Sequence, residues 1–265
     1  MKINDKTIIL TGAGSGIGRA LTLELLKSGA IVVAVDLRKD TLEILKNTIG
    51  DSRLHIYGLD VSDKAKVMEF SKQVIKDLGH VDGLINCAGI IQPFKKVNEL
   101  DYNDIERVMN VNFYGTVYMT KAFLPLLLDR PEAHIVNVSS MGGFLPVPGQ
   151  SVYGASKAAV KLFTEGLFAE FLDTNVRVSV VFPGATTTDI SKNSGVQTPS
   201  MPSDSAKNIP MLSAEKAAQI IVKGIEKNRA QIFTGNDSKT MNFLYRLNPV
   251  FATKFIAKKM SSLLT

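Results

Sequence analysis

The chain has 265 residues, of which 45% are hydrophobic, so it is long enough to bury a sizeable core. Its single cysteine, Cys87, excludes an internal disulfide, and its first ten residues lack the apolar stretch of a signal peptide. No apolar run approaches the roughly 20 residues that cross a bilayer, so we expect a cytoplasmic protein. The formal net charge is +6, and outside residues 237–265 the basic residues are mixed with acidic ones, which disfavours a nucleic-acid-binding protein.

Short apolar segments alternate with amphipathic segments along the chain. The apolar segments predict strands over residues 7–10, 31–35, 54–58, 83–86, 134–138, 176–182 and, more weakly, 231–233. The amphipathic segments predict helices over residues 16–28, 39–48, 63–78, 104–127, 152–172 and 214–227. Several strands are continuously apolar, which is typical of strands covered on both faces. The pattern predicts an α/β fold: a Rossmann-type, doubly wound parallel sheet in a single domain with a C-terminal helical extension.

A glycine-rich turn joins the first predicted strand to the first predicted helix. Residues 11–18 read Thr-Gly-Ala-Gly-Ser-Gly-Ile-Gly, and no Gly-Lys-Ser/Thr of a P-loop follows. Glycines let the backbone approach a pyrophosphate, and the N–H groups and dipole at the helix N-terminus favour an anion. An ordinary glycine turn is the alternative, but the position between strand and helix favours a dinucleotide site.

The second predicted strand ends at Asp36, 18 residues after Gly18. A carboxylate at this position accepts hydrogen bonds from the adenosine ribose hydroxyls and repels a 2′-phosphate, which favours NAD over NADP. An aspartate that only stabilises a turn is the simpler alternative. Arg38 could accommodate a phosphate, so NADP stays open as the second choice of cofactor.

Further short motifs follow the later strands. They are Asp60-Val61, Asn86-Cys87-Ala88-Gly89, Asn112, Ser140, Tyr153-x-x-x-Lys157, and Pro183-Gly184 with Thr188. Together with the glycine-rich turn and Asp36, they span residues 11–188 and resemble the short-chain dehydrogenase/reductase family. The resemblance implies an NAD or NADP cofactor and a homodimer or homotetramer.

The resemblance also implies which residues bind the cofactor. Asp60 and Val61 would contact the adenine, and Thr188 would bind the nicotinamide carboxamide. Asn86, Ala88 and Gly89 would line the cofactor and brace the sheet. The expected cofactor-binding residues are Gly12, Ser15, Gly16, Ile17, Gly18, Asp36, Leu37, Asp60, Val61, Asn86, Ala88, Gly89, Tyr153, Lys157, Pro183, Gly184 and Thr188. Cys87 takes the place of the usual second asparagine of its motif and is expected to be a buried structural thiol.

Tyr153 and Lys157 lie four residues apart in a predicted helix and therefore on one face of it. Alcohol oxidation needs an acceptor for a proton, and a free tyrosine has a pKa of about 10. An ammonium about 4 Å away, at an effective dielectric constant near 20, supplies roughly the 4 kcal/mol that would bring this pKa to about 7. We therefore expect Tyr153 to be the general acid/base and Lys157 to lower its pKa and position the ribose. An isolated Tyr-x-x-x-Lys match would be weak evidence, but this one follows the fifth predicted strand.

Ser140 and Asn112 complete the expected catalytic set. In the family reading, the Ser140 hydroxyl holds the substrate oxygen and stabilises developing negative charge, whereas Ser139 is structural. Asn112 would hold a water that links Lys157 to solvent. The predicted function is an oxidoreductase that interconverts a secondary alcohol and a ketone or aldehyde. A cofactor-binding sensor or scaffold without turnover, and an epimerase or dehydratase, remain as alternatives.

Three segments outside these motifs carry further expectations. Residues 141–152 should form the wall of the substrate pocket, with apolar side chains that suggest an apolar substrate, or else pack against another subunit. Residues 186–210 are the expected substrate lid. Residues 237–265 form a helical tail with five basic residues and one acid, for which packing on the domain or on a subunit is favoured over peripheral membrane contact. The three histidines and Cys87 lack metal-ligand spacing, so no metal site is expected.

Overall fold

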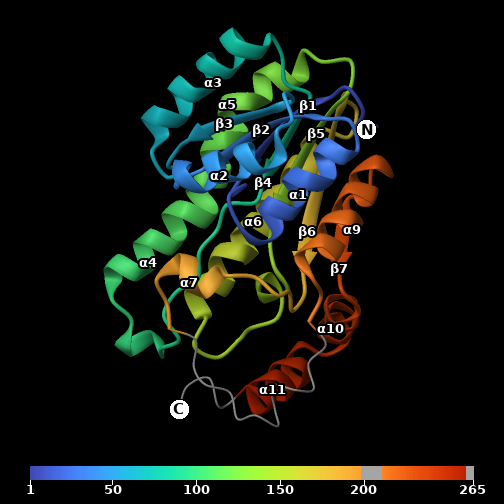
Figure 1. The fold of residues 1–265 in the computed structure, drawn as a ribbon. Helices are drawn as coiled ribbons and strands as arrows, with labels where there is room; N and C mark the ends of the chain where they lie inside the picture. The colour runs from blue at the N-terminus through green and yellow to red at the C-terminus, as the bar shows by residue number, and fades with distance from the viewer. Residues whose placement is uncertain (198–210, 261–265) are drawn as a thin grey trace.

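A parallel sheet with helices on both faces forms the molecule, shown in Figure 1 as a computed structural model that describes residues 1–197 and 211–260. The sheet has seven strands within these ranges, in the order β3-β2-β1-β4-β5-β6-β7, and every neighbouring pair is parallel. The strands are β1 (Thr7–Thr11), β2 (Ile31–Asp36), β3 (Leu54–Gly58), β4 (Gly83–Asn86), β5 (Ala133–Val138), β6 (Val176–Pro183) and β7 (Gln231–Thr234). The strands expected from the sequence are confirmed, each to within one residue at either end.

The helices divide into two layers because successive strand residues point to opposite faces of the sheet. On β1, Ile8 and Leu10 belong to one core cluster, and Ile9 belongs to the other. The first cluster is closed by α1 (Gly16–Lys27), α2 (Lys39–Ile49) and α9 (Ala214–Glu226). The second is closed by α3 (Lys64–Leu78), α5 (Gly115–Leu128) and α6 (Ser151–Glu170). The continuously apolar strands are therefore covered on both sides, as the doubly wound fold requires.

The strand order reverses at β1, which pairs with β2 on one side and β4 on the other. The chain runs outward through β2 and β3 and then returns to β4, so the connections after β1 and β4 leave in opposite directions. Such a reversal opens a crevice beyond the carboxyl ends of the strands, where ligands bind in folds of this type. The motifs at the ends of β1, β2, β4 and β5 therefore face one region.

The prediction of a single helix over residues 104–127 is wrong in one respect, because the segment is not one continuous α-helix. The structure has α4 (Tyr102–Met109), a π-helical turn (Asn110–Tyr114) and then α5. The turn carries Asn112, which is fully buried and exchanges hydrogen bonds with both backbone groups of Ile90. Asparagine competes with helix hydrogen bonds, and π-helical turns are frequent at functional sites.

The tail contains two helices in its described part, α10 (Asn236–Leu247) and α11 (Pro249–Lys259). The Oδ1 atom of Asn248 accepts a hydrogen bond from the Phe251 N–H at 2.9 Å, and Pro249 takes the first helical position. Asn248 therefore caps α11, and Pro249 suits the first position because its missing N–H would have no partner there. Residues 261–265 of the tail and residues 198–210 of the expected lid lie outside the described residues.

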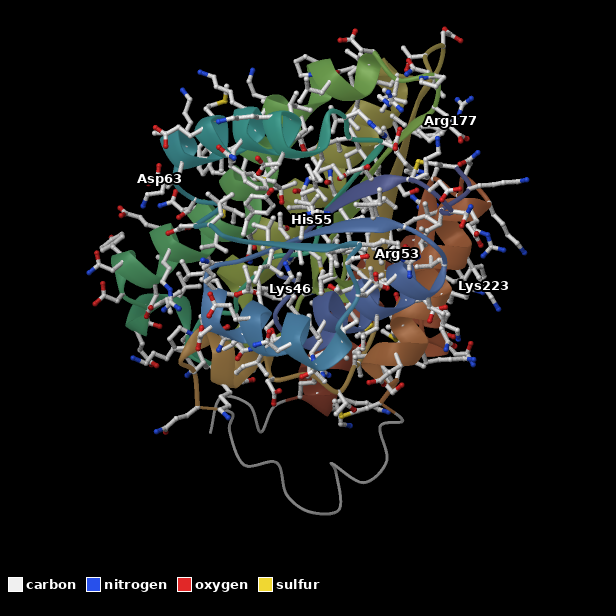
Figure 2. All side chains as sticks on the ribbon, turned by 45° about the horizontal axis from the view of Figure 1, so that its top comes forward. Lys46, Arg53, His55, Asp63, Arg177 and Lys223 are labelled. Atoms are coloured by element: carbon white, nitrogen blue, oxygen red, sulfur yellow. The ribbon has the colours of Figure 1, made fainter. Side chains whose placement is uncertain are left out.

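Charged side chains are spread over many elements in the view of Figure 2. The labelled Lys46, Arg177 and Lys223 lie on α2, β6 and α9. No helix within residues 1–197 and 211–260 is both long and apolar enough to cross a membrane.

Candidate cofactor and active site

A cleft of about 360 Å³ lies at the carboxyl ends of the strands and is bordered by the turn after β1, the ends of β2, β4 and β5, the start of α6 and residues 183–193. Every residue expected to bind the cofactor lines this cleft except Asn86. Of the four expected catalytic residues, Ser140, Tyr153 and Lys157 line it, and Asn112 does not. The sequence motifs therefore converge on one cavity.

The glycine-rich turn after β1 presents backbone without side chains to the cleft. Gly12 has a φ of +68°, a conformation that favours glycine. A Cβ atom on Gly18 would lie 1.9 Å from the carbonyl oxygen of Gly12, so no side chain fits at this position. The Thr11 hydroxyl accepts hydrogen bonds from the Cys87 and Ala88 N–H groups at 3.0 and 3.1 Å, which ties this turn to the end of β4.

Asp36 lies at the end of β2 and is fixed against the glycine-rich turn. Its carboxylate accepts hydrogen bonds from the Gly14 N–H at 2.9 Å and from the Arg38 N–H at 3.0 Å. Arg38 also lines the cleft, so both groups that bear on the choice between NAD and NADP are present at this end. Asp60 is held in a similar way, since its carboxylate accepts hydrogen bonds from the N–H and hydroxyl of Ser62.

Tyr153 and Ser140 meet at the opposite end of the cleft. A hydrogen bond with Ser140 lowers the pKa of Tyr153, but burial outweighs it and raises that pKa above its usual value. The expected fall of this pKa to about 7 is therefore wrong for the protein chain by itself. Burial removes the phenolate from water, and the hydration that it loses outweighs the stabilisation that its hydrogen bond provides.

Lys157 is buried, with 4% of its surface exposed, and its ammonium donates a hydrogen bond to the Val138 carbonyl at 3.0 Å. Burial lowers its pKa to about 8. A Cβ atom on Gly89 would lie 3.0 Å from Lys157 Nζ and 3.3 Å from Asn112 Oδ1, so the two side chains flank the same point. Lys157 faces the cleft, and Asn112 lies behind it.

Two expected site residues have a supporting position. Asn86 does not reach the cleft, because its amide donates to Asn137 at 2.8 Å and to Thr120 at 3.3 Å. It therefore braces β4 against β5 and α5, the second of the two roles expected for it. Asn112 donates to the Ser156 hydroxyl at 2.9 Å and so links the π-helical turn to α6.

The sequence reading missed Gln92, which is fully buried beside the start of α6. Its Oε1 atom accepts hydrogen bonds from the Val152 and Tyr153 N–H groups at 2.7 and 2.9 Å, and its Nε2 atom donates to the Gly149 carbonyl at 3.0 Å. The first N–H groups of a helix have no partner within it. Gln92 supplies this partner from a distant loop and fixes the backbone of Tyr153. No motif spacing marks it, although it is a polar residue directly after two isoleucines.

The expectation that residues 141–152 form the wall of the substrate pocket is wrong, because none of them lines the cleft. Leu145 is fully buried in a cluster with Ala252 and Ile256 of α11, and Met141 and Phe144 pack against the same cluster. These apolar side chains hold the tail on the domain and do not line the cleft. The tail therefore packs on its own domain, one of the outcomes favoured from the sequence.

The described part of the expected lid lies across the cleft as α7 (Ile190–Ser194) and its flanks. Asn193 Nδ2 donates to the Ser15 hydroxyl at 3.0 Å, and Arg107 donates to the Ser194 carbonyl at 3.0 Å. Asp237 accepts a hydrogen bond from the Ala185 N–H at 2.7 Å and anchors the start of this segment. Arg107, Asn193 and Asp237 were not singled out by the sequence.

The histidines and Cys87 lie in settings with little reactivity. Burial lowers the pKa of His134 to about 3 and raises the pKa of the Cys87 thiol to about 11. His55 lies on the edge strand β3 (Figure 2), and burial and nearby Lys46 lower its pKa. Within the described ranges, no group of three His, Cys, Asp or Glu side chains is arranged to hold a metal ion.

Comparison with known proteins decides the family. The model of the family described as short chain dehydrogenase matches residues 6–198. The chain belongs to the short-chain dehydrogenase/reductase family. A relative from Mycobacterium tuberculosis that is named as an oxidoreductase, SadH, is 36% identical over 251 residues, which cover 91% of this chain and 90% of the relative. A Staphylococcus aureus relative, also named as an oxidoreductase, is 35% identical over 188 residues, which cover 71% of this chain and 81% of the relative.

Solved structures of the same family share the fold over nearly the whole chain. A short-chain dehydrogenase/reductase from Burkholderia phymatum in complex with NAD has a TM-score of 0.85 and 26% identity, and the match covers 95% of this chain and 96% of that one. A short-chain dehydrogenase from Burkholderia cenocepacia in complex with NADP has a TM-score of 0.81 and 26% identity, and the match covers 97% of this chain and 99% of that one.

Replacement of Gln92 should destabilise the protein. The change Gln92→Met keeps the side-chain length but leaves buried N–H groups of Val152 and Tyr153 without a partner. Such groups cost about 1–3 kcal/mol each, so we expect the free energy of unfolding to fall by about 2–4 kcal/mol in urea titrations. Gln73→Met is the matched control, because Gln73 is exposed on α3, where its amide donates a hydrogen bond to Asp77. Equal stability of the two variants would contradict the role given to Gln92.

Replacement of Lys157 should stabilise the protein near neutrality. The pKa of Lys157 is about 8 in the folded chain, against 10.5 for an unperturbed lysine, so the unfolded state binds more protons between these values. The free energy of unfolding should therefore rise with pH through this window. Below it, the difference of about 2.5 pKa units corresponds to a cost of about 3 kcal/mol.

The change Lys157→Met removes this cost but also the hydrogen bond to Val138. We expect a net gain of about 1–3 kcal/mol near pH 7, and loss of the pH dependence, in urea unfolding. Lys161→Met is the control, since Lys161 lies one turn further along α6 and pairs with Glu165 at 2.8 Å, half-buried. A Lys157→Met protein less stable than the parent near pH 7 would refute the prediction.

Proposed function

We propose that the protein is an NAD(P)-dependent oxidoreductase that interconverts a secondary alcohol and a ketone or aldehyde, with Tyr153 as the general acid/base. The observation that carries this proposal is the arrangement of one cleft: Tyr153, Ser140 and Lys157 lie at one end and the glycine-rich turn and Asp36 at the other. A protein that only binds a nucleotide would need the second group but not the first.

The residues present fit a nicotinamide dinucleotide. The bare backbone at Gly12 and Gly18 and the start of α1 suit a pyrophosphate, and Asp36 suits the adenosine ribose. Asp60 and Val61 would flank the adenine, and Thr188, which lies against Gly16, would approach the carboxamide. When bound, the nicotinamide accepts a hydride from the alcohol or donates one to the carbonyl.

The protein residues handle the proton. For carbonyl reduction, Tyr153 must donate the phenolic proton to the substrate oxygen, and burial keeps that phenol protonated near neutral pH. Ser140, hydrogen-bonded to Tyr153, orients the same substrate oxygen and stabilises its partial negative charge. For alcohol oxidation, Tyr153 accepts the hydroxyl proton, and the ammonium of Lys157 is the protein group available to favour its phenolate. Lys157 would also hold the cofactor ribose.

NAD is the proposed cofactor, with NADP as the alternative. The support is the fixed Asp36 carboxylate, whose negative charge would repel a 2′-phosphate. Arg38 in the cleft wall supports the alternative, and the related Burkholderia structures contain NAD in one case and NADP in the other.

The substrate end of the cleft suggests an apolar alcohol or carbonyl compound. Ile90 and Ile190 line it, and α7 lies above it. Residues 186–197, the described part of the expected lid, would move to admit the substrate and close to exclude water from hydride transfer. The hydrogen bonds of Asn193 and Ser194 to Ser15 and Arg107 are the contacts that such a movement would break.

A homodimer is the proposed assembly. Large apolar side chains are exposed on α5 and α6, which pack on the same core cluster: Leu128 on α5 and Leu162 and Phe168 on α6. Burial of such a patch against a second copy is favourable. A tetramer would need a second interface. The solitary Cys87 and the apolar core are consistent with the cytoplasm as the proposed compartment.

The test of the proposed function is a titration with NADH and NADPH followed by a panel of alcohols and ketones, read at the absorbance of the reduced nicotinamide. We expect Tyr153→Phe to lower kcat by about 10²- to 10⁴-fold while the protein still binds the cofactor, because the acid/base is lost and the other residues expected to bind the cofactor remain. Tyr102→Phe, at an exposed position on α4, is the control. Turnover by Tyr153→Phe at the parent rate would overturn the assignment. Cofactor binding without any turnover would favour a sensor, and product formation without net reduction of NAD would favour an epimerase or dehydratase.

The preference for NAD predicts the effect of Asp36→Asn. Loss of the negative charge should shift the ratio of the NADH and NADPH dissociation constants toward NADPH by about tenfold, or about 1.4 kcal/mol. Asp40→Asn, exposed on α2, is the control and should leave the ratio unchanged. An unchanged ratio in Asp36→Asn would show that this carboxylate does not select the cofactor.

A further inference from the structure

Each of α10 and α11 has an exposed side that carries apolar and basic side chains, and these side chains are together termed the tail face. Its apolar members have between 38% and 68% of their surface exposed and are Phe243, Leu247, Val250, Phe251 and Phe255. Its basic members are exposed too and are Lys239, Arg246, Lys254, Lys258 and Lys259. Figure 1 shows α11 at the end of the molecule that also carries α7.

The tail face is distinct from the side of the tail that packs on the domain. In α11 the exposed positions 250, 251, 254, 255, 258 and 259 recur at helical spacing and form one stripe. Ala252 and Ile256, on the other side, are buried against Leu145. The fold therefore already uses one apolar side of α11, and Phe251 and Phe255 on the other side contribute little to the core. Their rings stack with centroids 6.4 Å apart, and Lys259 lies 5.2 Å from the centre of the Phe255 ring.

The charge of the tail face has one sign. No acidic residue occurs between positions 238 and 265. Asp237, just before this stretch, accepts the hydrogen bond from Ala185 and points toward the domain. If two copies of this face met, the five cations of one would lie against the five cations of the other. Repulsion between like charges therefore opposes self-association here. A nucleic acid would match the charge but leave the phenylalanines and aliphatic side chains of the face against a polar backbone.

We propose that the tail face binds the surface of an anionic lipid bilayer. Aromatic and aliphatic side chains on a helix that lies in the plane of the interface enter the boundary between headgroups and acyl chains. Lysine and arginine side chains place their aliphatic parts along the apolar layer and their charges among the lipid phosphates. The tail face has both components on adjacent helices, and the protein binds as a peripheral protein without a helix that crosses the membrane within the described ranges. This inference does not depend on the proposed catalytic activity.

Sedimentation of the full-length protein with vesicles tests the proposal. Vesicles of phosphatidylcholine with about one third phosphatidylglycerol should bind the protein, and pure phosphatidylcholine vesicles should bind it at least about tenfold more weakly. Raised salt should release it, because the cations are exposed. Phe251→Ser with Phe255→Ser, and separately Arg246→Gln with Lys254→Gln, should each lower the affinity by about tenfold or more.

Matched controls lie elsewhere on the surface. Ile44→Ser with Met68→Ser removes exposed apolar side chains from α2 and α3, and Lys46→Gln with Lys223→Gln removes exposed cations from α2 and α9. These variants should bind vesicles as the parent does. Circular dichroism and the NADH titration check that every variant is folded.

Three results of the vesicle assay would overturn the proposal: no binding of the parent to anionic vesicles, equal binding of the tail variants and the controls, or equal binding to neutral and anionic vesicles. Sedimentation velocity separates it from a subunit contact. If the Phe251→Ser, Phe255→Ser variant loses an oligomer that the parent forms, the tail face is a protein interface and the lipid assignment fails.

Discussion

The position of the first half of α6 determines the chemistry of this protein. Three separate segments fix it through buried hydrogen bonds: Gln92 accepts from the Tyr153 N–H, Asn112 donates to Ser156, and the Ser139 hydroxyl donates to the Lys157 carbonyl at 2.7 Å. Each bond starts from a loop or turn that follows a strand of the sheet or covers its end. The phenol and the ammonium are thereby held on a rigid helix that follows β5, while the glycine-rich turn follows β1, two strands away in the sheet.

Holding these two groups in buried positions costs electrostatic free energy. This cost does not stabilise the fold, but the proposed function accounts for it. The ammonium of Lys157 is nearly buried with one carbonyl partner, and its pKa falls to about 8. The phenol of Tyr153 is buried against Ser140, and its pKa rises. Burial thus favours the neutral form of each group: the phenol keeps its proton, and the ammonium releases its proton more readily than that of a free lysine. Apolar residues of similar size would fill a purely structural role at a lower cost in free energy.

Most of the fold could be predicted because its signals are local. Continuous apolar strands and amphipathic helices gave the order of the elements, and the strand ends gave the position of the cleft. The residues that escaped prediction act across long stretches of sequence. Gln92 serves N–H groups some 60 residues away, and Asp237 holds Ala185 from the far end of the chain. The π-helical turn at Asn112 could not be predicted either, because Asn112 makes hydrogen bonds with the backbone of Ile90, which lies in another loop. The pKa of Tyr153 was misjudged for a related reason: the spacing of Tyr153 and Lys157 shows their proximity but not the burial of both groups.

The apolar residues of the tail belong to two sets that overlap in the sequence. Its apolar residues are spread too widely for a single amphipathic stripe, which made packing on a protein surface the favoured reading. The structure separates them into an inner set, represented by Ala252 and Ile256, and an outer set, represented by Phe251 and Phe255. The inner set contacts Leu145, in the loop that follows Ser140, so the tail is physically continuous with the active-site end of the domain. A surface contact made by the outer set would therefore leave intact the inner packing that holds the tail against this loop.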